Sequence, residues 1–251
     1  MKLKAITLNM FGGNLLDRAI DFLKAENADI LFLQEVYGLN DQASDGQFRT
    51  LERAMQSLGE VYYDYVPGLR HNRKEGKFLQ GNAILSKFPI LKSKAIFFND
   101  PYNDNFIDSP ETDPMFPHVL QHVVLDTPIG EVNAFNLHGT WDLDGDNYSE
   151  KRQQMSQAII KAVEGKTRVI LAGDTNAKPT NKAMRDVEQY LNSVFGNELK
   201  STFNMNRKDN PGYATAAVDM VFVSSDVKII EKTCPEVDVS DHLPLVAILE
   251  I

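Results

Sequence analysis

The sequence predicts a mixed α/β fold. Short apolar runs rich in Ile, Val, Leu and Phe recur along the whole chain, as buried strands do. Amphipathic helical patterns separate some of these runs in the first and last thirds of the chain, whereas the middle third has strands with no helix between them. A purely parallel, doubly wound sheet needs a helix between neighbouring strands, so a mixed-sheet architecture fits the pattern better.

The predicted strands are the apolar runs that polar or turn-forming residues interrupt. In chain order they are residues 5–8, 30–33, 83–85, 95–98, 119–125, 132–137, 169–172, 218–223, 227–230 and 245–249.

Helices are predicted where apolar side chains recur with a helical period. The predicted spans are 15–26, 47–58, 149–164 and 181–191. Asn14 is the expected N-cap of the first helix, because its side chain can accept a hydrogen bond from a free backbone N–H. Gly59 and Gly165 are expected to end the second and third helices.

No internal repeat and no Gly/Ser-rich or Pro-rich linker divides the chain, so residues 1–251 are expected to form a single domain. One long irregular stretch, residues 99–117, carries acidic residues among aromatic ones. A loop of this length in a compact domain is usually functional or mobile.

Composition is ordinary for a soluble globular protein, with 43% hydrophobic and 24% charged residues. Lys and Arg total 26 against 35 Asp and Glu, and this net charge of -9 counts against generic DNA binding. The single cysteine, Cys234, cannot form an internal disulfide. The N-terminal apolar run is too short for a signal peptide and no run approaches the roughly 18 apolar residues of a membrane helix, so a cytoplasmic protein without stable membrane insertion is expected.

Polar clusters follow the ends of several predicted strands. They are Thr-Leu-Asn at 7–9, Leu-Gln-Glu at 33–35, Asn-Leu-His at 136–138, Gly-Asp-Thr-Asn at 173–176 and Val-Ser-Asp-His at 239–242. A further carboxylate, Asp219, stands inside an apolar strand. Because burial of an unpaired carboxylate is costly, Asp219 is expected to have a partner, and His242 is the natural one.

These clusters contain the parts that phosphate ester hydrolysis needs: a hard cation held by oxygen ligands, a positioned water and donors to the phosphoryl oxygens. Glu35, Asp241 and the amide of Asn9 are oxygen ligands suited to Mg²⁺. Asp174 can orient and deprotonate water, and Asn176 can hold that water or a phosphoryl oxygen.

The order of these motifs resembles the endonuclease/exonuclease/phosphatase superfamily, whose members are similar to DNase I and exonuclease III. The resemblance covers nearly the whole chain, and Gly-Asp-Thr-Asn together with Ser-Asp-His is its most specific part. It implies a four-layer α/β/β/α sandwich of two packed mixed sheets, with the site at one end of the sheets. It also implies Mg²⁺ as cofactor, with Mn²⁺ as a substitute.

The resemblance assigns roles to residues of this sequence. It implies that Glu35, Asn9 and Asp241 form the metal site. It implies that Asp174 activates the water with Asn176 beside it, that Asp219 orients His242, and that His138 contacts phosphate. Abasic-site endonucleases carry tyrosine at the position of His138, so this histidine favours other branches of the family.

Two positions depart from the pattern of the family's nucleases. Phe11 stands where some nucleases carry an acidic residue, so a second carboxylate on that strand is missing. Residues 214–217, Ala-Thr-Ala-Ala, replace the aromatic or basic pair of abasic-site enzymes, so no pocket for a flipped-out sugar is evident.

The favoured hypothesis is a Mg²⁺-dependent phosphodiesterase or nuclease that attacks phosphorus in line with an activated water. Its substrate is a phosphoester: a nucleic acid, a nucleotide-like molecule or a lipid headgroup. A phosphatase and a lipid phosphodiesterase of the phosphoinositide or sphingomyelin type are alternatives, and a catalytically silent scaffold of the same fold is a third. No protein partner is indicated.

A basic cluster precedes the 83–85 strand and is either a phosphate-contacting lip or a solvated loop. Its members are Arg70, His71, Arg73, Lys74 and Lys77. Within it, Glu75 is a candidate to orient His138.

Three weaker signals remain open. Asp142, Asp144 and Asp146 suggest a calcium loop but lack the EF-hand spacing, so an acidic loop before the third helix is the alternative. Trp141 is a candidate to stack on a base or line a rim, or to pack in the core. His118 and His122 are expected to be structural, because a strand spaces them too far apart to share a metal.

Overall fold

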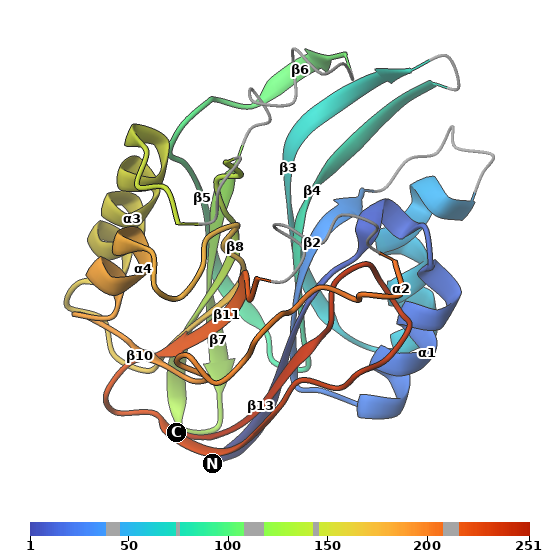
Figure 1. Cartoon of the computed structure of the whole chain (residues 1–251). Helices are drawn as coiled ribbons and strands as arrows, with labels where there is room; N and C mark the ends of the chain where they lie inside the picture. Colours follow the sequence, from blue (N-terminus) through green and yellow to red (C-terminus); the bar gives the residue numbers. More distant parts are fainter. Residues whose placement is uncertain (39–45, 74–75, 108–117, 143–145, 208–215) are drawn as a thin grey trace.

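Two mixed β-sheets pack face to face between two pairs of helices in the computed structural model of the chain (Figure 1). The structure describes residues 1–38, 46–73, 76–107, 118–142, 146–207 and 216–251. In this part of the chain no helix is long and apolar enough to cross a membrane.

The first sheet has seven strands in the order β12-β13-β1-β2-β4-β3-β6. Only the β1–β2 and β3–β6 pairs are parallel. The strands are β1 (Lys2–Asn9), β2 (Ile30–Tyr37), β3 (Tyr62–Arg73), β4 (Gly76–Ser86), β6 (Asn103–Phe106), β12 (Lys228–Thr233) and β13 (Leu245–Glu250).

The second sheet has six strands in the order β10-β11-β9-β8-β7-β5. Only the β8–β9 pair is parallel, so both sheets are mixed, as the sequence predicts. The strands are β5 (Ile90–Phe97), β7 (Val119–Thr127), β8 (Gly130–His138), β9 (Val169–Asp174), β10 (Asn192–Ser193) and β11 (Asp219–Val223).

Helices cover the outer face of each sheet. Helices α1 (Leu16–Glu26) and α2 (Thr50–Leu58) pack on the first sheet, and α3 (Glu150–Val163) and α4 (Lys182–Val187) pack on the second (Figure 1). Two 3₁₀ turns, η1 (Phe11–Gly13) and η2 (Gly46–Arg49), precede α1 and α2. This arrangement confirms the four-layer α/β/β/α sandwich.

The largest part of the core fills the space between the two sheets. Strand residues alternate between faces, so every second residue of the central strands points into this space. On β1 these residues include Leu3 and Ala5, and on β8 they include Val132 and Ala134. The two chain ends meet at one end of the sandwich, where Met1 and Ile251 exchange hydrogen bonds (Figure 1).

Three predicted helices differ from the observed ones, and the second of the four begins at Thr50 instead of residue 47, after the 3₁₀ turn η2. Helix α1 begins at Leu16 with Leu15 at the N-cap position, and the Asn14 side chain donates to the Phe11 carbonyl at 2.7 Å instead of capping the helix. The expectation for Asn14 was therefore wrong. The fourth helix is shorter than the predicted span 181–191, since α4 ends at Val187 and the chain then enters the short edge strand β10.

The basic cluster lies on a β-hairpin, not on a loop. Arg70 and His71 belong to β3 and Lys77 to β4, while Lys74 and Glu75 lie outside the described residues. His71 is buried, hydrogen-bonds to Gln80 and packs edge-on against Phe106, so its role is structural. The sequence missed β3 because many of its side chains are polar or half-exposed and show no clear apolar alternation.

The irregular stretch 99–117 contains the four-residue strand β6, which pairs with β3 at the sheet edge. Residues 108–117 lie outside the described residues, so the expectation of a functional or mobile loop stays a prediction.

Gly173 should be essential for stability, because it lets β9 approach β8 closely. Its φ is +146°, and a Cβ atom would lie 2.0 Å from the Leu137 carbonyl oxygen. We expect Gly173→Ala to lower the free energy of unfolding by about 3 kcal/mol, measured by urea denaturation. Gly59 has φ +83° but open space around it, so the control Gly59→Ala should cost only about 1 kcal/mol. Equal losses in the two variants would contradict the close-approach argument.

Candidate active site

Four predicted site residues lie on the faces that the two sheets turn toward each other, at the end opposite the chain termini. They are Asn9 at the end of β1, His138 at the end of β8, Asp174 at the end of β9 and Asp219 at the start of β11. Alternate residues further along each strand belong to the inter-sheet core. In the second sheet, His138 lies opposite Asp174, and Asp174 lies opposite Asp219.

Glu35 reaches the site through a β-bulge. Strict alternation would turn it to the helix-covered face with Leu33, but Gln34 and Glu35 together oppose a single residue of β4 between the Leu33 and Val36 pairs. Glu35 has φ +53°, a conformation that costs energy for a residue with a side chain. The bulge re-aims the carboxylate, which lies 4.0 Å from Nε2 of His138.

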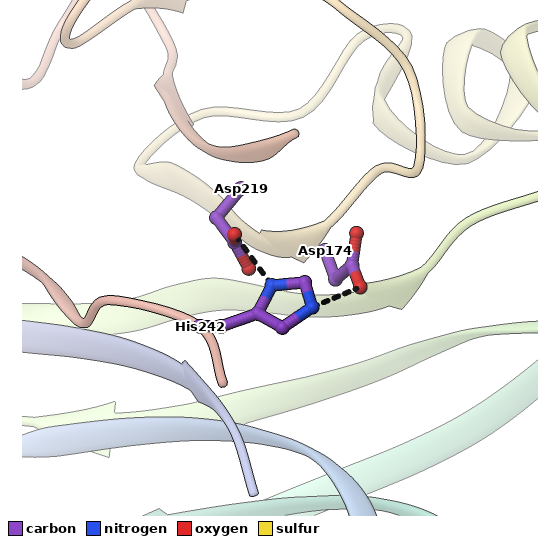
Figure 2. Close-up of side chains that lie close together, drawn as sticks. All are labelled: Asp174, Asp219 and His242. Carbon is purple, nitrogen blue, oxygen red and sulfur yellow. Dashed lines mark hydrogen bonds and ion pairs between the residues drawn. The ribbon is translucent and has the colours of Figure 1, made fainter. Parts of the chain in front are cut away.

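The His242 ring lies between two buried carboxylates (Figure 2). Its Nδ1 is 2.8 Å from Oδ2 of Asp219, and its Nε2 is 3.9 Å from Oδ2 of Asp174. The ring also packs against Phe203, with 4.6 Å between the ring centroids. The partner that the sequence expects for Asp219 is therefore in place, and the imidazole has one defined orientation.

Electrostatics make His242 a cation at neutral pH. Burial opposes its charge, but the Asp219 and Asp174 carboxylates outweigh burial and raise the pKa of His242 to about 10. Burial also raises the pKa of the Asp174 carboxyl, more than the neighbouring imidazolium lowers it. Asp174 is thus a stronger proton acceptor than an ordinary aspartate.

Asn9 joins the two sheets across the site. Its Nδ2 donates to Oε1 of Glu35 at 3.0 Å and to Oδ2 of Asp174 at 3.2 Å, while its Oδ1 accepts from the Phe11 N–H at 3.0 Å. The amide nitrogen therefore faces the carboxylates, whereas the sequence interpretation gave the metal the amide oxygen. The reason is the turn that follows β1, where the Phe11 N–H donates a hydrogen bond to the amide oxygen of Asn9.

Ser240 holds the Ser-Asp-His segment against the end of β1. Its hydroxyl donates to the Asn9 carbonyl at 2.6 Å and accepts from the His242 N–H at 3.2 Å. Asp241, which is 6% exposed, follows directly and so lies beside the Asn9 strand end. Of the predicted metal-site residues, Asn9 and Glu35 are in direct contact, and the segment that carries Asp241 is hydrogen-bonded to the end of β1 through Ser240.

A buried arginine that the sequence analysis missed supports the loop after β9. Asn176 has φ +50°, donates from its side chain to the Gly139 carbonyl at 2.9 Å, and accepts on its own carbonyl from Arg152. Arg152 is 0% exposed and also donates to the Asn147 carbonyl at 2.8 Å. The sequence did contain a signal for the burial of Arg152: it is a charged residue on the apolar face of the third helix, two turns before Ile159.

His118 proves to be a neighbour of the site. Its ring lies edge-on to the His138 ring, with 5.5 Å between centroids, and burial holds the pKa of His118 well below its usual range. His118 is therefore neutral beside His138. His122 instead stacks on Phe135 and hydrogen-bonds to Asn133, so the two histidines have different neighbours.

Two weaker signals have different outcomes. Trp141 is 45% exposed, so core packing is the wrong interpretation for it. In the acidic stretch, Asp142 accepts from Asn147 and Asp146 accepts from Lys178, while Asp144 lies outside the described residues. The choice between a calcium loop and an acidic loop therefore stays open.

One cluster among the described residues brings three potential metal-ligating side chains close together. One ligand atom each of Asp174, Asp219 and His242 lies within 4.8 Å of the others. The predicted ligands Glu35 and Asp241 do not belong to this cluster. Since a direct hydrogen bond already joins His242 to Asp219, the cluster has the geometry of a carboxylate–imidazolium pair beside a second carboxylate.

The four-layer fold is one that phosphoester hydrolases have. The sequence profile of the Endonuclease/Exonuclease/phosphatase family matches residues 6–242. The chain belongs to this family, and it is an enzyme that hydrolyses phosphoester bonds. No curated protein matches it in a sequence comparison.

Solved structures with the same fold span the full chain. A mannosyl-6-phosphatase from Bacteroides thetaiotaomicron has a TM-score of 0.71 and 18% identity, over 99% of this chain and 100% of that chain. Humanized TDP2 from D. rerio has a TM-score of 0.70 and 17% identity, over 100% of this chain and 99% of that chain. The human Nocturnin catalytic domain, with bound sulfate, has a TM-score of 0.70 and 17% identity, over 99% of this chain and 93% of that chain.

The charge of His242 should depend on Asp219. Replacing Asp219 by Asn removes the nearer carboxylate, so we expect the pKa of His242 to fall from about 10 toward its ordinary value of 6.5. NMR titration of the imidazole ring measures this directly. The control Asp226→Asn changes a carboxylate beyond the far end of β11 and should leave the titration unchanged.

The same substitution should alter the pH dependence of stability. The folded-state pKa of His242 lies above its unfolded value, so the ion pair stabilises the protein fully below about pH 6.5 and loses this effect as the pH rises toward 10. Thermal unfolding between pH 6 and 10, roughly the window set by this linkage, should show a weaker pH dependence in Asp219→Asn. A pH dependence identical to wild type would contradict the pairing.

Proposed function

We propose that the enzyme is a metal-dependent phosphodiesterase or nuclease that hydrolyses its substrate by in-line attack of an activated water. The observation that carries this proposal is the buried Asp174–His242–Asp219 arrangement, which supplies a proton acceptor and a fixed cation at one place. Phosphoryl transfer needs mainly positioning and stabilisation of negative charge, and these groups provide both.

Asp174 is the proposed base. It would orient the water and accept its proton as the water oxygen bonds to phosphorus, and the bond from phosphorus to the leaving oxygen then breaks. Its raised pKa favours proton uptake, and the Asn9 amide and the Asn176 N–H hold the carboxylate still through hydrogen bonds of 3.2 and 2.9 Å.

Hydrogen-bond donors are needed to stabilise the negative charge on the phosphoryl oxygens. The proposed donors are His242, which is cationic and held by Asp219, together with His138 and the side-chain amide of Asn176. His138 is buried, with 8% exposure, and its Nε2 lies 4.0 Å from Oε1 of Glu35, whose side chain is 29% exposed.

A divalent cation fits the residues around the end of β1. Glu35 and Asp241 are carboxylates, and the Glu35 side chain is 29% exposed, so it is open to an ion from solvent. We propose that these two residues would hold Mg²⁺, or Mn²⁺ in its place, and that Asn9 fixes Glu35 through the 3.0 Å hydrogen bond from Nδ2. The bound cation would supply charge stabilisation to the phosphoryl group.

The substrate class is the open part of the proposal. A phosphodiester in nucleic acid, a nucleotide-like molecule and a lipid headgroup all fit the same centre, and the net charge of -9 favours a small or locally exposed phosphodiester. A phosphatase reaction is the second candidate, and the similarity to a structure described as a mannosyl-6-phosphatase adds sugar phosphates to the substrates worth testing. A silent scaffold is less favoured because all the proposed reacting groups are present and most are buried in contact with one another.

Loss of the proposed base should abolish turnover. We expect Asp174→Asn to lower kcat by about 10²–10⁴-fold, because the amide cannot accept the proton of water. The assay compares the variant with wild type on plasmid DNA, single-stranded RNA, inositol polyphosphates, sphingomyelin vesicles, a sugar 6-phosphate and a chromogenic diester. Asp126→Asn, at an exposed position in β7, is the control that should retain full turnover. Full activity of folded Asp174→Asn would refute the assignment.

Metal binding should depend on Glu35 and not on Asp219. Glu35→Gln removes a proposed ligand and is expected to weaken Mn²⁺ binding by at least about tenfold in isothermal titration calorimetry. Asp219→Asn should leave the Mn²⁺ affinity close to wild type, because this carboxylate is engaged by His242. The opposite result would place the cation in the Asp174–Asp219–His242 cluster. Removal of metal with EDTA should abolish turnover, and added Mg²⁺ should restore it.

A further inference from the structure

Beneath the candidate active site, the interface between the two sheets changes from apolar to polar. Five polar side chains that are 0–1% exposed lie there, one on each of β1, β2, β4, β7 and β8. We call them the inter-sheet polar layer; they are Thr7, Gln34, Asn82, Gln121 and Asn136.

The centre of the layer is a direct amide–amide hydrogen bond between the sheets. Nε2 of Gln34 donates to Oδ1 of Asn136 at 2.6 Å and to the Thr7 hydroxyl at 3.1 Å. Nδ2 of Asn136 donates in turn to the Leu33 and Ala83 carbonyls, at 2.9 and 3.0 Å. One side chain of the second sheet thus binds two adjacent strands of the first.

Gln121 and Asn82 also bridge the sheets. Nε2 of Gln121 donates to the main-chain oxygen of Asp64 at 2.9 Å and to its carboxylate at 2.7 Å. Nδ2 of Asn82 donates to the Val119 carbonyl at 3.2 Å. Because these bonds are directional, they define how one sheet lies on the other in a way that apolar contacts do not.

The layer residues lie beneath the site residues in the structure and are close to them in the sequence. Gln34 immediately precedes Glu35, which the β2 bulge turns toward the site. Asn136 precedes His138 by two positions, so the two residues share the inner face of β8, and Thr7 stands in the same relation to Asn9 on β1.

The site itself spans the two sheets. Glu35 comes from the first sheet and lies 4.0 Å from His138 of the second, and Asn9 of the first donates to Asp174 of the second at 3.2 Å. A relative shift of the sheets would change both distances. Apolar residues of similar size could fill the same volume, so burial by itself does not explain the amides.

We propose that Gln34 and Asn136 are positioning residues. Their inter-sheet hydrogen bond holds Glu35 and Asn9 in register with His138 and Asp174, and so sets the geometry of the cation and phosphate sites. This inference rests on the proposed function of those four residues.

The test uses Gln34→Met and Asn136→Leu, each close in size to the original side chain, and the double variant. We expect each single substitution to weaken Mn²⁺ binding by about tenfold in calorimetry, as loss of supporting contacts does at other metal sites. The double variant should lose less affinity than the product of the two single effects, because both substitutions break the shared Gln34–Asn136 bond. On a substrate that wild type cleaves, kcat should fall with KM little changed.

The control is Leu125→Ala, which removes a buried side chain from the apolar part of the same interface, away from the site. It should lower the melting temperature as the amide variants do, but leave Mn²⁺ affinity and kcat unchanged. Thr7→Val removes only one hydroxyl of the layer, and it replaces Asn136→Leu in the test if that variant does not fold. It should weaken Mn²⁺ binding as well, by a smaller factor.

A readout independent of metal and turnover separates this inference from the proposed function. The ring chemical shifts of His138 and His242 in metal-free protein should move in Gln34→Met and stay in place in Leu125→Ala. If wild type cleaves no phosphoester but these shifts move, the proposed function fails and the positioning role stands. Amide variants that lose stability yet keep wild-type ring shifts and Mn²⁺ affinity would overturn the positioning role.

Discussion

Face-to-face packing of the two sheets is the constraint on which the rest of the structure depends. Each strand turns every second side chain into the inter-sheet space, so that space must be filled by residues at alternate positions. Near the chain termini these positions hold residues such as Leu3, Ala5 and Val132. Toward the opposite end of the strands, the same alternate positions hold polar residues. The first are those of the inter-sheet polar layer, and Asn9 and His138 follow them. Asn9, His138, Asp174 and Asp219 therefore extend the alternating pattern of the core, whereas Glu35 depends on a bulge and His242 on the segment before β13.

Burial of charge follows from this geometry and gives the site its chemistry. Asp174, Asp219 and His242 are each less than 10% exposed, so a charge on any one of them needs a partner. The imidazolium of His242 serves both carboxylates, at 2.8 and 3.9 Å, and its pKa rises to about 10. Glu35, by contrast, keeps a partly exposed carboxylate. The site thus combines a buried part suited to proton transfer with an open part suited to a cation from solvent.

The family's fold is kept at low sequence identity, because the frame needs alternation and close packing more than particular side chains. The structures described as a mannosyl-6-phosphatase and as Nocturnin share only 18% and 17% identity with this chain, yet match it over nearly its full length. Trp141, three positions after His138 in the sequence, is 45% exposed in this chain.

The sequence by itself predicted most of the strands, the order of the motifs and the pairing of Asp219 with His242, and the resemblance of that motif order to a known family implied the sandwich. These features depend on the alternation of apolar and polar residues and on residue types, both of which can be read from short segments of the sequence. Tertiary structure alone decided the strand identity of the β3 residues around His71, the bulge that turns Glu35 inward, and the burial of Arg152 behind Asn176. Each of these depends on a partner distant in the chain, and sequence periodicity carries no information on which distant groups will meet. Asn9 shows the same limit at atomic scale: its place at the site was predictable, but the N–H of Phe11 decides which end of its amide faces the carboxylates.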